Sequence, residues 1–192
     1  RYGFDPWFKL GDMDLATHIY RTYLIKNGLT LSQATLELCR RLGLKVKLIP
    51  ATDGYLRTII VSNEGRLAFQ EYFVKRKCEP KVLDVVFEGA DAAEPAPGVL
   101  ESLEEADVII LCPSNPILSI GPILAVRAIR CLLRSFQKPI VAVSPIVAGR
   151  ALKGPADKIM LELGLKPSAL TVAELYKDFL KVFIMDVRDE EI

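Results

Sequence analysis

The chain has 192 residues, of which 51% are hydrophobic, and its 25 Lys and Arg against 24 Asp and Glu give a formal net charge of +1. A chain of this length can bury a sizeable core, and its balanced charge excludes the broad basic field with which proteins bind nucleic acid. No apolar run approaches the length of a membrane span, and the first residues do not form a signal peptide. The four cysteines show no CxxC spacing, so we expect reduced thiols in a cytoplasmic protein that acts on small molecules.

Two helices are predicted at the start of the chain. Apolar residues at helical spacing favour a helix over residues 14–26, which Gly28 would end. Thr30 and Gln33 are spaced as in a capping box, so a second helix should begin there and run through Leu42. These helices precede every predicted strand.

A strand-rich segment follows over residues 45–88. Strands are predicted over residues 46–50, 58–62, 67–74 and 82–87. Asn63-Glu-Gly65 is a turn signal between the middle two strands. An Ala- and Pro-rich linker at 90–98 and a short acidic helix at 99–106 lead into the rest of the chain.

Strands and helices alternate in the last part of the chain. Strands are predicted over residues 108–112, 140–143 and 182–185, and helices over residues 123–136, 156–163 and 172–180. Such alternation implies right-handed crossovers and a mainly parallel sheet. We therefore predict one Rossmann-like α/β domain over residues 1–192, with helices on both faces of the sheet and residues 45–88 as an inserted strand-rich subregion.

Polar residues follow the first of these strands, where a doubly wound sheet opens its ligand crevice. Ser114, Asn115 and Ser119 lie there, and Gly121 with Pro122 is expected to begin a helix whose free N–H groups face the crevice. Hydroxyls, an amide and a positive helix end would form a phosphate cradle. The alternative is a plain turn whose side chains bond their own backbone.

The next strand, over residues 140–143, delivers a second polar loop to the same sheet edge. This loop contains Lys153 among small residues, which suits a phosphate-contacting lysine, although the spacing is not that of a P-loop. The alternative is a solvated lysine in an exposed loop. Two neighbouring loops of this kind favour the ligand crevice, because such a site draws on both strand ends.

Polar groups also interrupt the first helix and the first turn of the strand-rich segment. His18 and Arg21 fall on one side of the helix, and Asp12 lies near its N-terminus, where the dipole favours a carboxylate. A cap and a solvated face are the ordinary explanation. Asp53 lies in a plain turn signal, and the forked donors of Arg57 beyond it suit phosphate.

Five stretches, which keep their order and span nearly the whole chain, carry a resemblance to a known family. They are WFKLGDMDLATHIYRT, RTIIVSNEGRLAFQEYFV, CPSNPILSIGPIL, VAVSPIVAGRALKGPADKIM and VAELYKDFLKVFIMD. The chain resembles the 2-phospho-L-lactate transferase (CofD) family. This resemblance implies a Mg²⁺-dependent transfer of a 2-phospholactyl group, or in some members a phosphoenolpyruvyl group, during the assembly of coenzyme F(420). The donor is linked to guanosine diphosphate, the acceptor is the terminal ribityl hydroxyl of the deazaflavin Fo, and GMP is released.

The resemblance also implies that the chain is a fragment of a longer protein. The family's glycine-rich GGTG loop and the aspartates expected to hold Mg²⁺ precede the segment that begins here, and the family's final segment is absent. No metal ligand is therefore assignable in this chain. Thr52-Asp53-Gly54 stands where many members have Ser-Asp-Asp, a departure that removes one carboxylate from this turn.

The residues that match the family's motifs take their roles from that resemblance. The nucleotide and its phosphates should contact Ser114, Asn115, Ser119, Gly121, Lys153, Arg57 and Thr52. The deazaflavin should lie against Lys9, Asp12, His18 and Arg21. The attacking hydroxyl belongs to the substrate, and Asp53 is a candidate for accepting its proton.

Two other functions stay open. One is a non-enzymatic, nucleotide-sugar-binding regulatory protein of the same superfamily, and the other is an interaction module whose loops are only turns. The string PSNPILSIGP argues against the regulator, because those relatives resemble the family in fold more than in this loop. We expect neither a membrane nor nucleic acid as partner; the oligomeric state is open, and a homodimer is compatible with the sequence.

Overall fold

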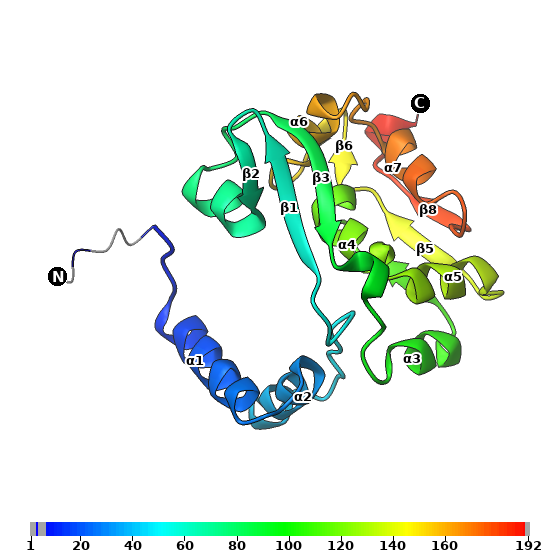
Figure 1. Cartoon of the computed structure of the whole chain (residues 1–192). Coiled ribbons are helices and arrows are strands. Elements are labelled where there is room, and N and C mark those ends of the chain that lie inside the picture. Colours follow the sequence, from blue (N-terminus) through cyan, green and yellow to red (C-terminus); the bar gives the residue numbers. More distant parts are fainter. Residues whose placement is uncertain (1–2, 4–6, 191–192) are drawn as a thin grey trace.

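The computed structural model describes residue 3 and residues 7–190, and it contains a three-stranded parallel sheet (Figure 1). The strands are β4 (Ile109–Leu111), β5 (Ile140–Val143) and β8 (Val182–Ile184), in the order β4-β5-β8. Each lies within a run that the sequence predicts as a strand. Together with the helices that connect them, these strands confirm the α/β fold class.

Helices precede and separate these strands. They are α3 (Val99–Glu105), α4 (Gly121–Ala125), α5 (Arg127–Ser135), α6 (Ala156–Glu162) and α7 (Ala169–Leu175). The single helix predicted over residues 123–136 is broken, because Val126 between α4 and α5 has an extended backbone with φ −70° and ψ 103°. Among the described residues no single helix is long and apolar enough to span a membrane, although the pair Pro116–Ala125 and Arg127–Ser135 meets those criteria jointly with a 90° bend.

The helix predicted over residues 172–180 begins earlier and ends earlier. Ser168 is its N-cap, and the hydroxyl of Ser168 accepts a hydrogen bond from the backbone N–H of Thr171 at 3.1 Å. Serine is among the residues that stabilise a helix start in this way, so the cap sets where α7 begins.

The two faces of the parallel sheet differ in burial. Ile109 and Ile140 on one face are buried in the main core with side chains of α5 and α7. On the opposite face, Ile110 and Val182 are 58% and 46% exposed, and both are in register with Val141 between them. In the described part of the chain, helices thus cover one face of this sheet rather than the two predicted.

The strand-rich segment forms a separate antiparallel sheet. Its strands are β1 (Arg57–Ser62), β2 (Gly65–Ala68) and β3 (Val82–Glu88), in the order β2-β1-β3. Ser62 pairs with Gly65, so the chain reverses at Asn63 and Glu64 as the turn signal predicts.

Two predictions within the strand-rich segment are wrong. The strand predicted over residues 67–74 ends at Ala68, and a π-helical turn, Glu71–Lys75, follows because the ring of Tyr72 is fully buried in a second apolar cluster. The strand predicted over residues 46–50 is not formed, and the side chains of Val46 and Leu48 are 64% and 53% exposed. This segment has no neighbouring strand in the described chain to supply the missing backbone pairing.

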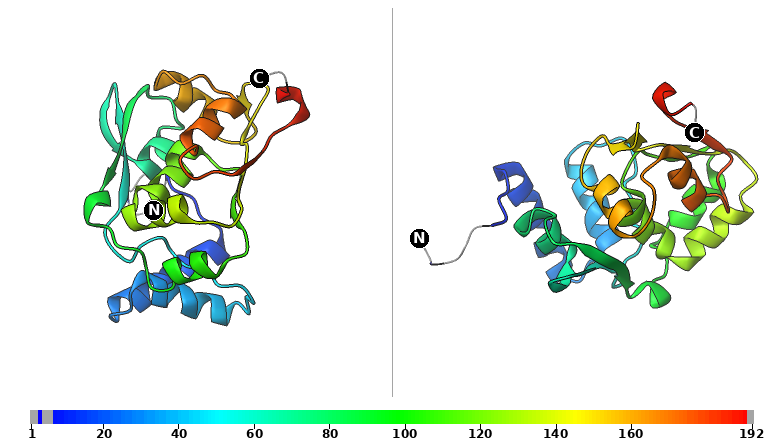
Figure 2. Two further views of the ribbon diagram at one scale, coloured as in Figure 1. Left: turned by 90° about the vertical axis from the view of Figure 1, so that its right-hand side faces the viewer. Right: turned by 90° about the horizontal axis from the view of Figure 1, so that it is seen from above.

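The first two helices lie at one end of the molecule, away from β8 (Figure 1 and Figure 2). They are α1 (Asp12–Lys26), which begins slightly earlier than predicted, and α2 (Leu31–Arg41), and they pack against each other. The predicted capping box at the start of α2 is present. Gln33 donates its backbone N–H to Thr30 Oγ1 at 3.3 Å, and Gln33 Oε1 accepts the backbone N–H of Thr30 at 3.0 Å.

A short hairpin that the sequence analysis did not predict leads from β5 to the loop of Lys153. It consists of β6 (Ile146–Val147) and β7 (Arg150–Ala151), with Ala148 and Gly149 at positive φ in its turn. The backbone N–H of Ala148 donates to Oδ1 of the buried Asp189 at 2.9 Å. That contact holds the turn in a conformation that alanine rarely adopts.

Candidate functional site

A cavity of about 320 Å³ brings together the two polar loops that follow β4 and β5. Ser114, Asn115 and Ser119 line it from the first loop, and Lys153 lines it from the second. The carboxyl ends of adjacent parallel strands meet at one sheet edge, which is why residues nearly forty positions apart share this space. The predicted convergence of these four residues is confirmed.

The amide oxygen of Asn115 is occupied by its own backbone. Asn115 Oδ1 accepts the N–H groups of Ile117 and Leu118, each at 2.9 Å, and Asn115 is the N-cap of the π-helical turn Pro116–Ile120. The helical start thus lies at Asn115 and not at Gly121, so the cradle of free N–H groups expected there is not formed. Asn115 would therefore contact a ligand through its Nδ2 group.

Gly121 lies in a different part of the fold from Lys153. A methyl group on Gly121 would stand 2.9 Å from Cζ of Phe87 and 3.3 Å from the carbonyl oxygen of Pro116. Glycine is therefore required by close packing of α4 against β3. Gly121 lines a separate cavity, which includes Asp84 and Phe87.

The turn before β1 is also apart from this cavity. Both carboxylate oxygens of Asp53 accept hydrogen bonds from Ser32, one from its backbone N–H and one from its hydroxyl, each at 2.6 Å. Thr52 Oγ1 accepts the N–H of Gly54 at 3.0 Å. The guanidinium of Arg57 lies 5.2 Å from the centre of the Tyr55 ring. The structure thus places Thr52, Asp53 and Arg57 in local contacts outside the cavity of Lys153.

The residues expected to border the deazaflavin lie on or just before α1. Lys9 is exposed, and Asp12 is the first residue of the helix. Arg21 Nη2 lies 2.6 Å from Nδ1 of His18 one turn earlier. α1 packs against α2, and neither His18 nor Arg21 lines the cavity of Lys153.

The sequence analysis missed the aromatic wall of this cavity. Phe69 and Phe73 both line it, and their rings are stacked with centres 5.4 Å apart and planes 22° apart. Phe69, Tyr72 and Phe73 stand at positions i, i+3 and i+4, which is the spacing of a helical face. That spacing was the available signal for a helical turn here.

The described residues contain no preformed cluster of acidic, histidine or cysteine ligands for a metal ion. In that part of the chain, no three His, Cys, Asp or Glu side chains lie together in a way that could hold a metal ion. Mg²⁺ prefers carboxylate oxygens and phosphates, and the residues lining the cavity of Lys153 include no carboxylate.

Comparison with known proteins decides the family. The model of the family described as "2-phospho-L-lactate transferase CofD" matches residues 1–191. The chain belongs to the CofD family. A 2-phospho-L-lactate transferase of Methanopyrus kandleri is 43% identical over 194 residues, covering 99% of this chain and 62% of the relative. A phosphoenolpyruvate transferase of Streptomyces coelicolor is 44% identical over 180 residues, covering 91% of this chain and 56% of the relative.

The CofD chain thus spans about three-fifths of the length of these relatives. A solved structure of a UPF0052-family protein from Bacillus halodurans is similar with a TM-score of 0.56 and 18% identity, covering 90% of this chain and 61% of that one. At this identity the likeness concerns the fold, and it agrees with the α/β class.

Proposed function

We propose that this CofD-family protein transfers a 2-phospholactyl or phosphoenolpyruvyl group from a guanosine diphosphate-linked donor to the ribityl hydroxyl of the deazaflavin Fo, in coenzyme F(420) assembly. The relatives named 2-phospho-L-lactate transferase and phosphoenolpyruvate transferase support this reaction class. The observation that carries the proposal is the single cavity in which Ser114, Ser119 and Lys153 face an aromatic wall. Such a site suits substrates that combine phosphates with a flat ring.

In phosphoryl transfer the protein mainly positions the two substrates and neutralises the negative charge that develops on the phosphate oxygens. In this proposal the ribityl hydroxyl attacks the phosphorus that carries the acid and releases its proton to solvent. The bond from that phosphorus to the bridging oxygen breaks, and GMP leaves with the electron pair of that bond. Lys153 offsets the developing negative charge, and the hydroxyls of Ser114 and Ser119 donate hydrogen bonds to phosphate oxygens. Mg²⁺, when bound, would neutralise further phosphate charge.

Asp53 does not fit the role of proton acceptor in this cavity. Its carboxylate is bound by two donors of Ser32 at the start of α2 and lines another cavity with Thr30 and Lys47. A general base must reach the proton that it accepts, either directly or through one water. We therefore assign Asp53 to holding α2 in place.

Two measurements on the full-length natural protein test the proposal. Titration with GDP and with Fo separates the functions, because a transferase binds both, a regulator binds the nucleotide alone and an interaction module binds neither. Turnover with competing guanylylated donors, read by mass spectrometry of the product, then identifies the acid that is transferred. A full-length protein that binds GDP tightly and ignores Fo would contradict the transferase.

Three further expectations from the sequence are predictions that need their own tests. They are the dependence on Mg²⁺, the cytoplasmic location and the homodimer. Activity after chelation and metal replacement, cell fractionation, and light scattering on the purified protein would test them in turn.

A further inference from the structure

We propose that Asp189 is a positioning residue for Lys153, on which it acts through the hairpin of β6 and β7. This inference rests on the proposed function, in which Lys153 offsets phosphate charge. Asp189 ends the short 3-10 turn Val187–Asp189, which follows β8. Its Oδ1 accepts the backbone N–H of Ala148 at 2.9 Å, across 41 positions of sequence. The contact therefore joins the chain beyond β8 to the hairpin that precedes Lys153.

The second oxygen of this carboxylate is buried without a partner. Asp189 Oδ2 makes no hydrogen bond in the described part of the chain, and the residue is only 1% exposed. Removing a carboxylate from water costs free energy unless hydrogen bonds replace the lost solvation. The hydrogen bond from Ala148 is the contact through which this costly group acts on the hairpin.

The backbone of Ala148 shows what that hydrogen bond does. Ala148 has a φ of +48° and Gly149 a φ of +76°, so both residues of the two-residue turn are in the left-handed region. Glycine adopts this region readily, whereas the Cβ of alanine makes it costly. Asp189 holds Ala148 in the strained conformation by accepting its N–H. Without this acceptor the turn would relax and β7 would shift with it.

The hairpin transmits the position of its turn to Lys153. Ile146 of β6 pairs with Ala151 of β7. The backbone N–H of Leu152 donates to the Pro145 carbonyl oxygen at 3.2 Å. The chain is therefore in a fixed register up to the residue before Lys153.

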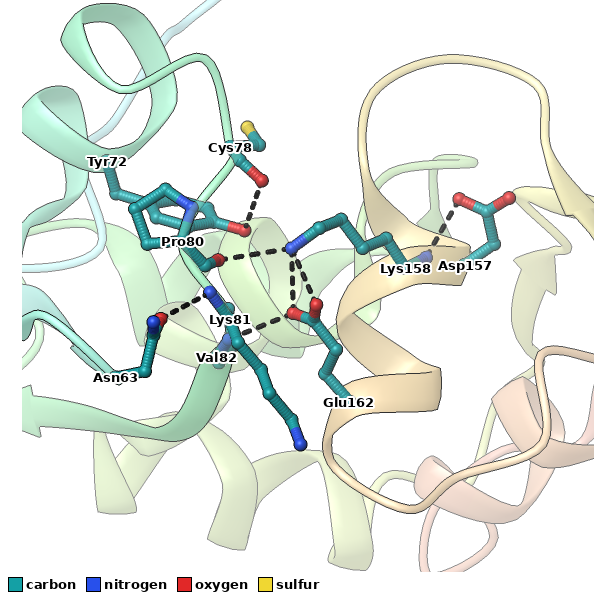
Figure 3. A network of polar contacts seen from close by, with 9 residues as sticks. All are labelled: Asn63, Tyr72, Cys78, Pro80, Lys81, Val82, Asp157, Lys158 and Glu162. Atoms are coloured by element: carbon teal, nitrogen blue, oxygen red, sulfur yellow. Dashed lines mark hydrogen bonds and ion pairs between the residues drawn. The ribbon is translucent and has the colours of Figure 1, made fainter.

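A polar network holds the chain on the other side of Lys153 (Figure 3). Lys158 Nζ donates to the Pro80 carbonyl oxygen at 3.1 Å and to Glu162 Oε2 at 2.8 Å. That same oxygen accepts the N–H of Val82 at 2.9 Å. Lys158 and Glu162 belong to α6, which begins three residues after Lys153. The loop of Lys153 thus lies between two anchored elements.

The loop itself contributes little packing that could place the lysine. Gly154 has a φ of +72°, and a methyl group there would meet no atom within 4 Å in the described chain. A charged group stabilises a reacting phosphate only when it is held at the right place, and a shift of about 1 Å is costly. The position of Lys153 therefore depends on the anchors, of which Asp189 is the one that acts on the hairpin.

The test measures the Kd of the full-length natural protein for GDP. Asp189→Ala removes the acceptor of the Ala148 N–H, so the Kd for GDP should rise about fivefold. Asp189→Asn keeps an oxygen for that N–H, so its Kd should stay within about twofold of the wild type. Glu190→Ala is the matched control, because Glu190 is the neighbouring carboxylate and is exposed.

Two double changes distinguish positioning from a general loss of structure. In a Lys153→Met background, Asp189→Ala should raise the Kd no further, because Asp189 acts through Lys153. Ala148→Gly lets the turn adopt its conformation without strain, so adding it to Asp189→Ala should recover part of the GDP affinity. A merely structural role predicts equal losses with and without Lys153.

Amide hydrogen exchange at Ala148 and Leu152 reports on the hairpin without any ligand, and exchange at both should be faster in Asp189→Ala. Exchange equal to that of the wild type overturns the proposal, because the hairpin would not depend on the carboxylate. A wild-type protein that binds GDP, with an Asp189→Ala variant of equal affinity, also overturns it and leaves the transferase intact. A wild-type protein without affinity for GDP contradicts both. Thermal unfolding sets a temperature at which every variant is folded.

Discussion

The carboxylate of Asp53 accepts hydrogen bonds from both the backbone N–H and the hydroxyl of Ser32, and each donor lies 2.6 Å from its oxygen. Ser32 is in the first turn of α2. The carboxylate of Asp53 therefore binds the N-terminus of α2, where the helix dipole is positive, to the turn before β1. Because hydrogen bonds to a charged group are lost, we expect Asp53→Ala to lower the free energy of unfolding by about 2 kcal/mol. Urea unfolding followed by circular dichroism measures this loss.

A double-mutant cycle tests the pairing directly. Ser32→Ala removes the hydroxyl donor, so Ser32→Ala and Asp53→Ala together should cost less than the sum of the single changes. Additive costs would mean that the two side chains do not interact. An Asp53→Ala enzyme that keeps its stability and loses most of its kcat would instead assign proton transfer to Asp53.

Lys158→Met should loosen the contact between α6 and the segment 80–82. The change removes the hydrogen bonds from Lys158 Nζ to Pro80 and to Glu162, while Glu162 keeps the N–H of Val82. Lys158 is partly exposed, so the free energy of unfolding should fall by only about 1 kcal/mol. The KM for the acceptor should rise severalfold with little change in kcat, because the aromatic wall is less well positioned.

Lys166→Met is the matched control for this change, since Lys166 is an exposed lysine of the loop after α6. Steady-state kinetics with the acceptor varied give KM and kcat separately. Equal KM values for the Lys158→Met and Lys166→Met enzymes would show that the network does not position the aromatic wall.

Features with a local signal could be predicted from the sequence. Ile140–Val143 is an unbroken apolar run, which predicted β5. Thr30 and Gln33 are the two residues of a capping box, which predicted the start of α2. The meeting of Ser114 and Lys153 was also predictable, because it follows from the parallel direction of two adjacent strands.

Features that depend on tertiary contacts could not be predicted in this way. Val126 breaks a helix although no Pro or Gly lies within residues 123–136, and its full burial indicates that packing decides the break. Tyr72 lies between Phe69 and Phe73 in the sequence and packs in the same apolar cluster as Leu118, which belongs to the loop that follows β4. This packing brings Phe69 and Phe73 to the cavity. This contact joins the helical turns Glu71–Lys75 and Pro116–Ile120, which lie far apart in the sequence, so neither segment by itself shows that they meet.

Gly121→Ala should destabilise the protein without weakening nucleotide binding. Its new methyl group would approach Cζ of Phe87 to 2.9 Å, and overpacking of this kind costs about 1–3 kcal/mol. The double change with Phe87→Leu should recover part of that loss by shortening the opposing side chain. Urea unfolding and GDP titration measure the two effects, and a normal stability with a weakened GDP affinity would return Gly121 to the nucleotide site.

Asp178 should contribute stability that is lost in acid. Burial works to raise the pKa of its carboxyl, but hydrogen bonds from Arg130 at 2.9 Å and Arg134 at 2.6 Å hold that pKa below the ordinary 3.8. The folded state therefore binds a proton less readily than the unfolded state. The contribution of Asp178 is complete above the ordinary pKa and declines as the pH falls through the lower folded-state value.

Asp178→Asn should therefore flatten the loss of stability below about pH 4, where the wild-type carboxylate begins to be protonated in the unfolded chain. Urea unfolding over a pH series measures the slope. Glu174→Gln, a change at an exposed carboxyl of α7, is the matched control. Identical acid slopes for the wild type and Asp178→Asn would show that the two arginines do not stabilise this carboxylate.

Asn115→Asp separates the capping role of Asn115 from a role in binding. Aspartate keeps the oxygen that accepts the N–H groups of Ile117 and Leu118, so thermal stability should be unchanged, whereas Asn115→Ala should cost about 1 kcal/mol. A diphosphate bound between Ser114 and Lys153 would be repelled by the new carboxylate, which should raise the Kd for GDP by about tenfold. Calorimetric titration and thermal unfolding measure both. Full GDP affinity in Asn115→Asp, with affinity lost in Lys153→Met, would place the phosphates away from the loop that follows β4.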